Sequence, residues 1–88
     1  MRRTFTITVY NDAGHAWGKV KRQVLQELNL LPKVSSYSYQ YKDNVYLEED
    51  CDLNMLCQLL NEQDVRVKFV EKFTTGNSRI RSYERFQA

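Results

Sequence analysis

The densest group of side chains able to do chemistry is acidic. Residues 43–64 contain seven Asp and Glu residues and no Lys or Arg, and four of the acids lie close together at Glu48, Glu49, Asp50 and Asp52. Calcium loops place oxygen ligands on alternate residues around a glycine turn, and that spacing is absent, so we expect no metal site. The acids favour either the N-terminus of a helix or an exposed acidic patch that binds a basic partner protein.

Nucleophilic and metal-binding side chains are sparse. Cys51 and Cys57 lack CxxC spacing, and together with His15 they fall short of the roughly four ligands of a structural zinc site. Carboxylates beside Cys51 oppose a thiolate, Cys57 lies on an apolar stripe, and His15 has no nucleophile near it in the sequence. We therefore expect no catalytic residue, no cofactor and no enzymatic activity. The low cysteine content is typical of a cytoplasmic protein with reduced thiols.

A glycine-rich segment at residues 14–20 falls between a predicted strand and a predicted helix, where a phosphate-binding loop would lie. Such a loop needs four residues between its glycines and a Ser or Thr after the Lys. Here three residues separate Gly14 from Gly18, and Val20 occupies the hydroxyl position. We expect no nucleotide site, and we expect Gly18 to make room where a helix crosses a sheet.

Basic and aromatic side chains alternate near the C-terminus, at Arg79, Arg81, Tyr83 and Arg85. Arg and Tyr are enriched among the residues that dominate protein interfaces. This basic tail is therefore a second candidate partner-binding surface. The alternative is an edge strand that its charges keep from aggregating.

Hydrophobic periodicity predicts the elements that position these groups. Period-two alternation predicts strands over residues 4–10, 34–41, 45–47 and 65–69. Helical spacing predicts one helix over residues 14–29, through Trp17 and Val20, and a second with a buried stripe of Leu53, Leu56, Cys57 and Leu60. Asp50 or Asp52 is expected to cap the second helix. Residues 78–86 form either a short extra strand or a tail after a turn at Gly76.

The two middle strands are predicted to form a hairpin. A three-residue loop with Asn44 in the left-handed conformation pairs Tyr41 with Val45 and Tyr39 with Leu47, which puts the apolar side chains on one face. The pattern leaves open whether the face of Tyr37, Tyr39 and Tyr41 is buried.

The resulting order, strand, helix, strand, strand, helix, strand (βαββαβ), predicts an α+β protein with the ferredoxin-like split βαβ fold. Its four-stranded antiparallel sheet would carry both helices on one face, with Trp17 buried between helix and sheet. We expect a complete single domain over residues 1–88, with residues 76–88 as a flexible or strand-forming tail. No apolar run approaches the ~18 residues of a membrane span. We also expect no signal peptide before the first strand.

The open face of such a sheet predicts an alternative function. RNA-recognition domains of this topology stack bases on aromatic side chains of the central strands. Tyr10 and Tyr46 are the candidate platforms here, with Arg66 and Lys68 on phosphates. Against this reading, residues 44–49 lack the glycine of the RNA-recognition signature and carry two acids.

Protein binding is the function that these patterns favour. A domain without catalytic groups acts by occupying a surface, and separate acidic and basic zones with six Tyr suit a protein partner. We expect a small inhibitor or regulator that occludes its partner's surface, of the kind that phages and mobile elements encode. Single-stranded nucleic-acid binding is the alternative, and homodimerisation through an edge strand fits the same pattern.

Overall fold

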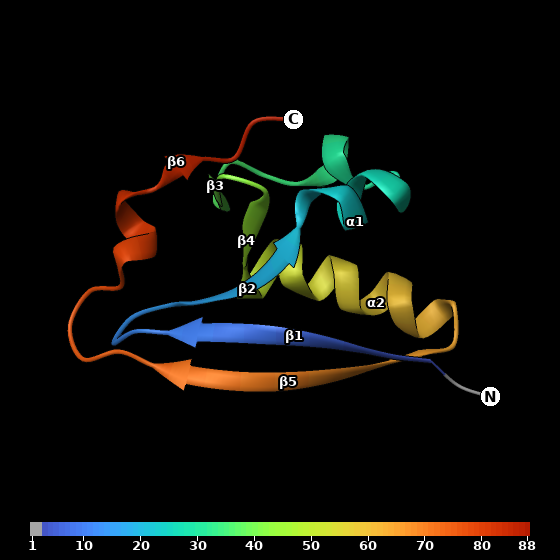
Figure 1. The fold of residues 1–88 in the computed structure, drawn as a ribbon, viewed down its shortest axis with the longest axis horizontal. Coiled ribbons are helices and arrows are strands. Elements are labelled where there is room, and N and C mark those ends of the chain that lie inside the picture. The colour runs from blue at the N-terminus through green and yellow to red at the C-terminus, as the bar shows by residue number, and fades with distance from the viewer. Residues whose placement is uncertain (1–2) are drawn as a thin grey trace.

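The chain forms a six-stranded mixed sheet in the computed structural model, which describes residues 3–88 (Figure 1). The strands are β1 (Arg3–Asn11), β2 (Ala16–Lys21), β3 (Tyr39–Tyr41), β4 (Asn44–Glu48), β5 (Val65–Phe73) and β6 (Glu84–Arg85). Their order across the sheet is β5-β1-β2-β4-β3-β6, with β1 and β5 parallel and the other pairs antiparallel. The predicted four-stranded antiparallel ferredoxin-like sheet is therefore wrong.

One main helix, α2 (Asn54–Glu62), packs against β5 and is preceded by a π-helical segment, η2 (Glu49–Leu53). The other helical segments are short: α1 (Arg22–Glu27), η1 (Leu31–Lys33) and η3 (Arg79–Ser82). The predicted apolar stripe is confirmed at Leu53, Leu56 and Leu60, which are buried. Within residues 3–88, none of these helices is long and apolar enough to cross a membrane.

The predicted helix over residues 14–29 is wrong because the chain turns back as a hairpin. The Asp12 carboxylate accepts hydrogen bonds from the backbone N–H groups of Gly14 and His15, at 3.0 and 2.9 Å. The Asp12 N–H donates to the carbonyl oxygen of His15 at 2.9 Å. These contacts close a tight hairpin loop in which the Asp12 carboxylate caps two backbone N–H groups.

The side chains of β2 have a spacing that also fits a helix, and this is why a helix was wrongly predicted for residues 14–29. Trp17 and Val20 are three residues apart, which suits a helix, but they lie on opposite faces of a strand. Val20 shares the buried face with Ala16, whereas Trp17 pairs with Tyr10 across the sheet. Val disfavours helix and favours strand. Helix α1 begins only at Arg22 and has six residues.

Gly18 lies at a position without room for a side chain. A Cβ atom at this position would lie 2.6 Å from Leu53 Cδ1 and 3.1 Å from Ile7 Cγ2. The close approach expected at Gly18 is therefore confirmed, although Gly18 belongs to a strand and Leu53 to the segment that crosses it.

The hairpin of β3 and β4 has a shorter loop than predicted. Tyr41 pairs with Asn44 and Tyr39 with Tyr46, and Lys42 takes the left-handed conformation at φ 54°. The predicted register and the left-handed Asn44 are wrong. Tyr46 lies on the face opposite α2, where the C-terminal residues cover it. Apolar side chains can therefore be buried on both faces of the hairpin.

The C-terminal residues 74–88, called the strap below, run from the end of β5 back to β3 (Figure 1). Gly76 turns the chain with φ 78°. Ile80 is buried against Trp17 and Tyr46, and β6 pairs with β3. The predicted extra strand is confirmed for Glu84–Arg85. Trp17 is buried as predicted, but it lies under the strap and not between a helix and the sheet.

Candidate functional site

The fold uses part of the acidic segment. Glu48 precedes η2, and its carboxylate accepts hydrogen bonds from the N–H groups of Asp50 and Cys51, both at 3.2 Å. Glu48 is therefore the cap of this helical segment. The prediction that Asp50 or Asp52 would fill this role is wrong.

Asp52 lies inside the protein and is only 3% exposed. Its Oδ2 atom accepts hydrogen bonds from Ser35 N at 3.0 Å, from Ser35 Oγ at 2.7 Å and from Ser38 Oγ. These bonds hold residues 34–38 as a turn, so the predicted strand over 34–41 shrinks to Tyr39–Tyr41. Of the four candidate acids, only Glu49 and Asp50 are exposed.

Two arginines of the predicted basic tail hold the strap to loops of the rest of the domain. Arg81 Nε lies 2.7 Å from Asp12 Oδ2, and its guanidinium lies 5.3 Å from the centroid of the Trp17 ring. Arg85 donates from Nη1 to the carbonyl oxygen of Ser36 at 3.0 Å. Such contacts stabilise the docked strap, and they occupy both guanidinium groups.

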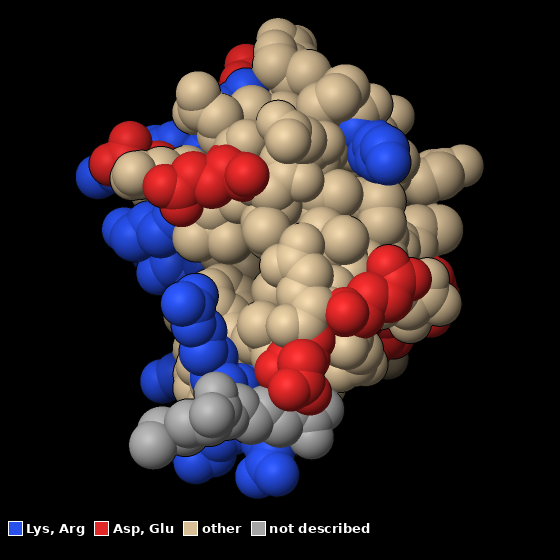
Figure 2. Space-filling model, turned by 90° about the vertical axis from the view of Figure 1, so that its right-hand side faces the viewer, with Lys and Arg blue, Asp and Glu red and all other residues tan. Residues whose placement is uncertain are grey.

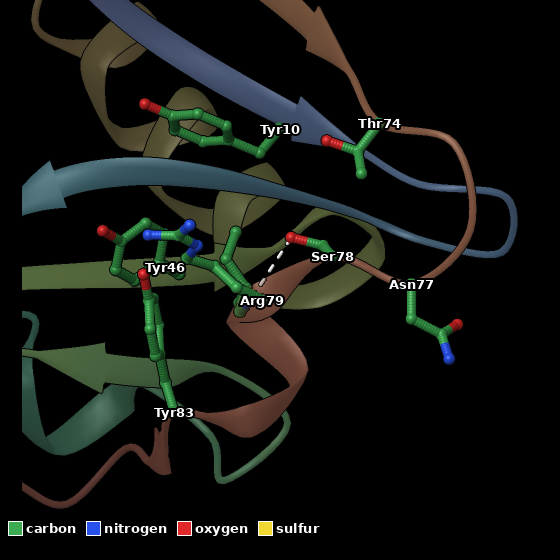
Figure 3. Close-up of a pocket in the computed structure, with 8 residues that line it drawn as sticks. Tyr10, Tyr46, Thr74, Asn77, Ser78, Arg79 and Tyr83 are labelled. Atoms are coloured by element: carbon green, nitrogen blue, oxygen red, sulfur yellow. Dashed lines mark hydrogen bonds between the residues drawn. The ribbon is translucent and has the colours of Figure 1, made fainter.

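The third arginine of this group, Arg79, lines a pocket with a volume of about 590 Å³ (Figure 3). Three phenols also line it: Tyr10 from β1, Tyr46 from β4 and Tyr83 from the strap. The Tyr46 ring centroid lies 6.3 Å from that of Tyr10 and 5.2 Å from that of Tyr83. The pocket completed by Thr74, Asn77, Ser78 and Ile80 is called the tyrosine pocket below.

Tyr46 lies at the back of the tyrosine pocket. It is only 7% exposed, because Tyr83 and the rest of the strap cover it. Burial, followed by the neighbouring phenols of Tyr83 and Tyr10, raises the pKa of Tyr46 to about 12. A phenol is already protonated at neutral pH, and the raised pKa keeps that of Tyr46 able to donate a hydrogen bond in more alkaline solution as well. The predicted pair of open stacking platforms is reduced to the half-buried Tyr10.

Cations gather on the sheet face opposite α2. Strand register places Thr4 beside Arg66, Thr6 beside Lys68, and Thr8 beside Lys19. The cations at these alternating positions form the basic face: Lys19, Lys21, Arg66, Lys68 and Lys72. No acid occupies the matching positions of β1, β2 or β5 in the described chain. In Figure 2 most of the visible Lys and Arg atoms lie along the left-hand side.

The outer strand β5 carries three large exposed apolar side chains. The exposed fractions are 48% for Phe69, 42% for Val70 and 77% for Phe73. The predicted strand ended at residue 69 with Phe69 facing the core. Phe69 does lie on the same face as the buried Ile7, but its side chain stays exposed at the edge of the sheet. Val70 and Glu71 interrupt the period-two alternation after residue 69, so the sequence pattern gave no clear signal for the longer strand.

Strand β5 also has one free backbone edge. Thr74 N–H donates to the Asn11 carbonyl at 2.9 Å, and Asn11 Nδ2 donates to the Lys72 carbonyl at 3.2 Å. The even-numbered residues of β5 thus direct their N–H and C=O groups toward β1. Because these directions alternate along a strand, the backbone groups of Phe69 and Glu71 point outward. No strand pairs with that edge within residues 3–88.

Neither cysteine is activated. Burial and the nearby Glu48 carboxylate raise the pKa of the exposed Cys51 thiol, and burial raises the pKa of the Cys57 thiol. Thiolate is the reactive form, so both side chains are poor nucleophiles at neutral pH. In the part of the chain that the structure describes, no cluster of three His, Cys, Asp or Glu residues could hold a metal ion.

No protein-family model, curated protein or solved structure matches this chain. The described chain offers three surfaces for a ligand or partner: the β5 edge, the basic face and the tyrosine pocket.

Proposed function

We propose that this protein is a non-enzymatic protein-binding module that receives an extended segment of its partner along the open edge of β5. The supporting observation is a nine-residue outer strand with Phe69, Val70 and Phe73 exposed beside it. Proteins usually shorten, cover or charge their edge strands because an open edge pairs with other chains. Addition of a partner strand would satisfy the outward backbone groups and shield the apolar side chains.

The two faces of β5 differ, and the difference defines the partner. Phe69 pairs with the buried Ile7 and Phe73 with Asn11, so both phenylalanines project from the same face as the core. Apolar side chains of an added strand would contact them there. Covering one such aromatic side chain contributes roughly 1.5–3 kcal/mol.

The opposite face of β5 projects Arg66, Lys68 and Lys72. Carboxylates on alternate residues of an added strand would lie beside these cations, since opposite charges across neighbouring strands are favourable. The partner segment is therefore extended, with apolar residues on one face and acidic residues on the other.

A second copy of β5 fits this edge poorly. Antiparallel pairing centred on Phe69 would put Arg66 opposite Lys72. Shifting the register by two residues puts Lys68 opposite either itself or Lys72. Like charges directly opposite one another destabilise a sheet. The homodimer considered from the sequence is thus a weaker candidate than an acidic partner.

A proline substitution tests the site. Glu71→Pro removes an N–H that points away from β1, so it blocks strand addition and leaves the β1 pairing intact. Glu71→Ala is the matched control for the side chain. The probe is a fluorescent ten-residue peptide that alternates Glu and Val, followed by fluorescence anisotropy on the full chain.

We expect the peptide to bind the wild-type protein and Glu71→Ala, and to bind Glu71→Pro at least about tenfold more weakly, because the outer ladder of hydrogen bonds is lost. A peptide of the same composition in scrambled order should bind more weakly as well. Equal binding of Glu71→Pro, or equal binding of the scrambled peptide, would rule out strand addition. No binding of the alternating peptide would rule out the partner chemistry.

The basic face supports a second candidate function, binding of single-stranded nucleic acid. Five cations lie there without an acid among them, and Tyr10 offers one half-buried ring. Phosphate contacts make affinity fall steeply with salt. If a twelve-nucleotide RNA binds at near-physiological salt and the double variant Arg66→Ala, Lys68→Ala abolishes binding, the nucleic-acid function replaces the protein-binding one.

A further inference from the structure

Three of the four arginines in or beside the strap make contacts that fix the strap to the rest of the domain. Arg22 donates from Nη2 to the carbonyl oxygen of Gln87 at 2.9 Å and lies over the Phe86 ring. Arg81 and Arg85 make the contacts described above. Arg79 is exposed, and among the described residues its guanidinium has no hydrogen-bond, ion-pair or ring partner. The strap therefore carries one cation that its own docking does not use.

Arg79 directs this free guanidinium into the tyrosine pocket. Figure 3 shows the guanidinium at the same end of the pocket as the hydroxyl groups of Tyr10, Tyr46 and Tyr83. The rings come from two strands and from the strap, so the site exists only when the strap is docked. No acid is among the residues that line it in the described chain.

These groups share one chemistry, which is hydrogen-bond donation to an anion. A guanidinium carries five N–H donors in a planar fork that fits two oxygens of a phosphate. Phenol hydroxyl groups are protonated at neutral pH and can donate a hydrogen bond to an anion. In the strand register Lys72 lies beside Tyr10, and Lys19 lies beside Tyr46. Both cations make the potential around the pocket more positive.

We infer that the tyrosine pocket binds the phosphate group of a phosphate monoester. Arg79 contacts two phosphate oxygens, and phenol hydroxyls donate to the group from the other side. A monoester presents three free oxygens, which suits donors that converge from several directions. A phosphodiester within a chain presents only two, and it would favour an open groove over a pocket. The aromatic rings contact the organic part of the ligand. The proposal does not depend on the β5 edge.

The test uses the full chain and phenyl phosphate as the probe, titrated by isothermal calorimetry. We expect saturable 1:1 binding that Arg79→Gln weakens at least about tenfold, because a charged bidentate contact is lost. Arg79→Lys should be intermediate, since it keeps the charge without the fork. Lys33→Gln removes an exposed cation outside the pocket and should leave affinity unchanged. Tyr10→Phe keeps the ring and removes one donor, and it should weaken binding less than Arg79→Gln does.

Further ligands identify the source of the phosphate. If a phosphopeptide binds more tightly than phenyl phosphate, and Arg79→Gln weakens this binding too, the monoester belongs to a modified partner protein. If inorganic phosphate binds as tightly as phenyl phosphate, the organic part of the ligand makes no contact and the monoester assignment is wrong. An oligonucleotide that lacks terminal phosphates and competes equally would contradict the monoester assignment. Absence of saturable binding up to about 10 mM phenyl phosphate, a weak-affinity limit, would overturn the proposal, as would unchanged affinity in Arg79→Gln.

Discussion

Arg81 and Asp12 join the strap to the loop of the first hairpin through a two-point ion pair. Arg81 Nε lies 2.7 Å from Asp12 Oδ2, and Nη2 lies 3.0 Å from Oδ1. Asp12 Oδ2 also accepts a hydrogen bond from Ser78 N–H at 3.0 Å. One carboxylate therefore both closes the hairpin loop and anchors a segment that lies more than sixty positions later in the chain.

The ion pair predicts a pH-dependent stability. The hydrogen bond from Arg81, followed by that from Ser78, holds the pKa of Asp12 well below its usual range. A carboxyl whose pKa is lowered by folding adds stability above its unfolded pKa of about 3.9, and this contribution is lost as the pH falls below that value. Urea denaturation should therefore show Asp12→Asn less stable than wild type at about pH 7, with the difference shrinking below about pH 4.

Glu49→Gln is the control for this measurement, since Glu49 is exposed and lies outside the ion pair. It should unfold at nearly the wild-type urea concentration at neutral pH. A difference between wild type and Asp12→Asn that stays constant from about pH 7 to about pH 3 would show that the carboxylate charge does not anchor the strap.

Ile80 is the apolar anchor of the strap and is only 2% exposed. Truncation of a buried Ile destabilises a protein by about 2–5 kcal/mol, and truncation of a buried Trp by about 3–5 kcal/mol. We expect losses of this size for Ile80→Ala and Trp17→Ala in chemical denaturation followed by circular dichroism. Arg79→Ala should change the free energy of unfolding by no more than about 0.5 kcal/mol. A near-zero effect of Ile80→Ala would mean that the strap is not docked.

The contact between Asp52 and Ser38 should matter more for stability than the exposed acids do. Ser38 is buried, and its Oγ both donates to Asp52 Oδ2 and accepts from Glu48 N–H at 3.0 Å. Removing one partner of a buried hydrogen bond leaves the other unsatisfied and costs about 1–3 kcal/mol. Denaturation of Ser38→Ala and Asp52→Ala should show this loss, and a double-mutant cycle should show that the two effects are not additive. Additive effects would contradict direct coupling.

Local patterns predicted those elements whose burial is set by near neighbours in sequence. The alternation of Phe5, Ile7 and Val9 correctly predicted β1, and the spacing of Leu53 and Leu56 correctly predicted one buried helical stripe. Both patterns have one period and no competing one. The pair Trp17 and Val20 fits two structures. In a helix, residues three apart lie on the same face, and in a strand they point to opposite faces, which suits a strand that is covered on both sides. Only pairing with β1 decides between the two.

Chemistry at the surface depended almost entirely on tertiary structure. The sequence determined that acids gather near residue 50, that arginines and tyrosines gather near the C-terminus, and that no metal-binding or nucleophilic motif is present. It could not distinguish Arg79 from Arg81, two residues of one type in one short segment. Arg81 reaches Asp12 across the folded strap, whereas Arg79 faces phenols contributed by distant strands. A side chain is free or occupied according to which remote groups the fold brings within hydrogen-bonding distance, and that is a property of long-range packing.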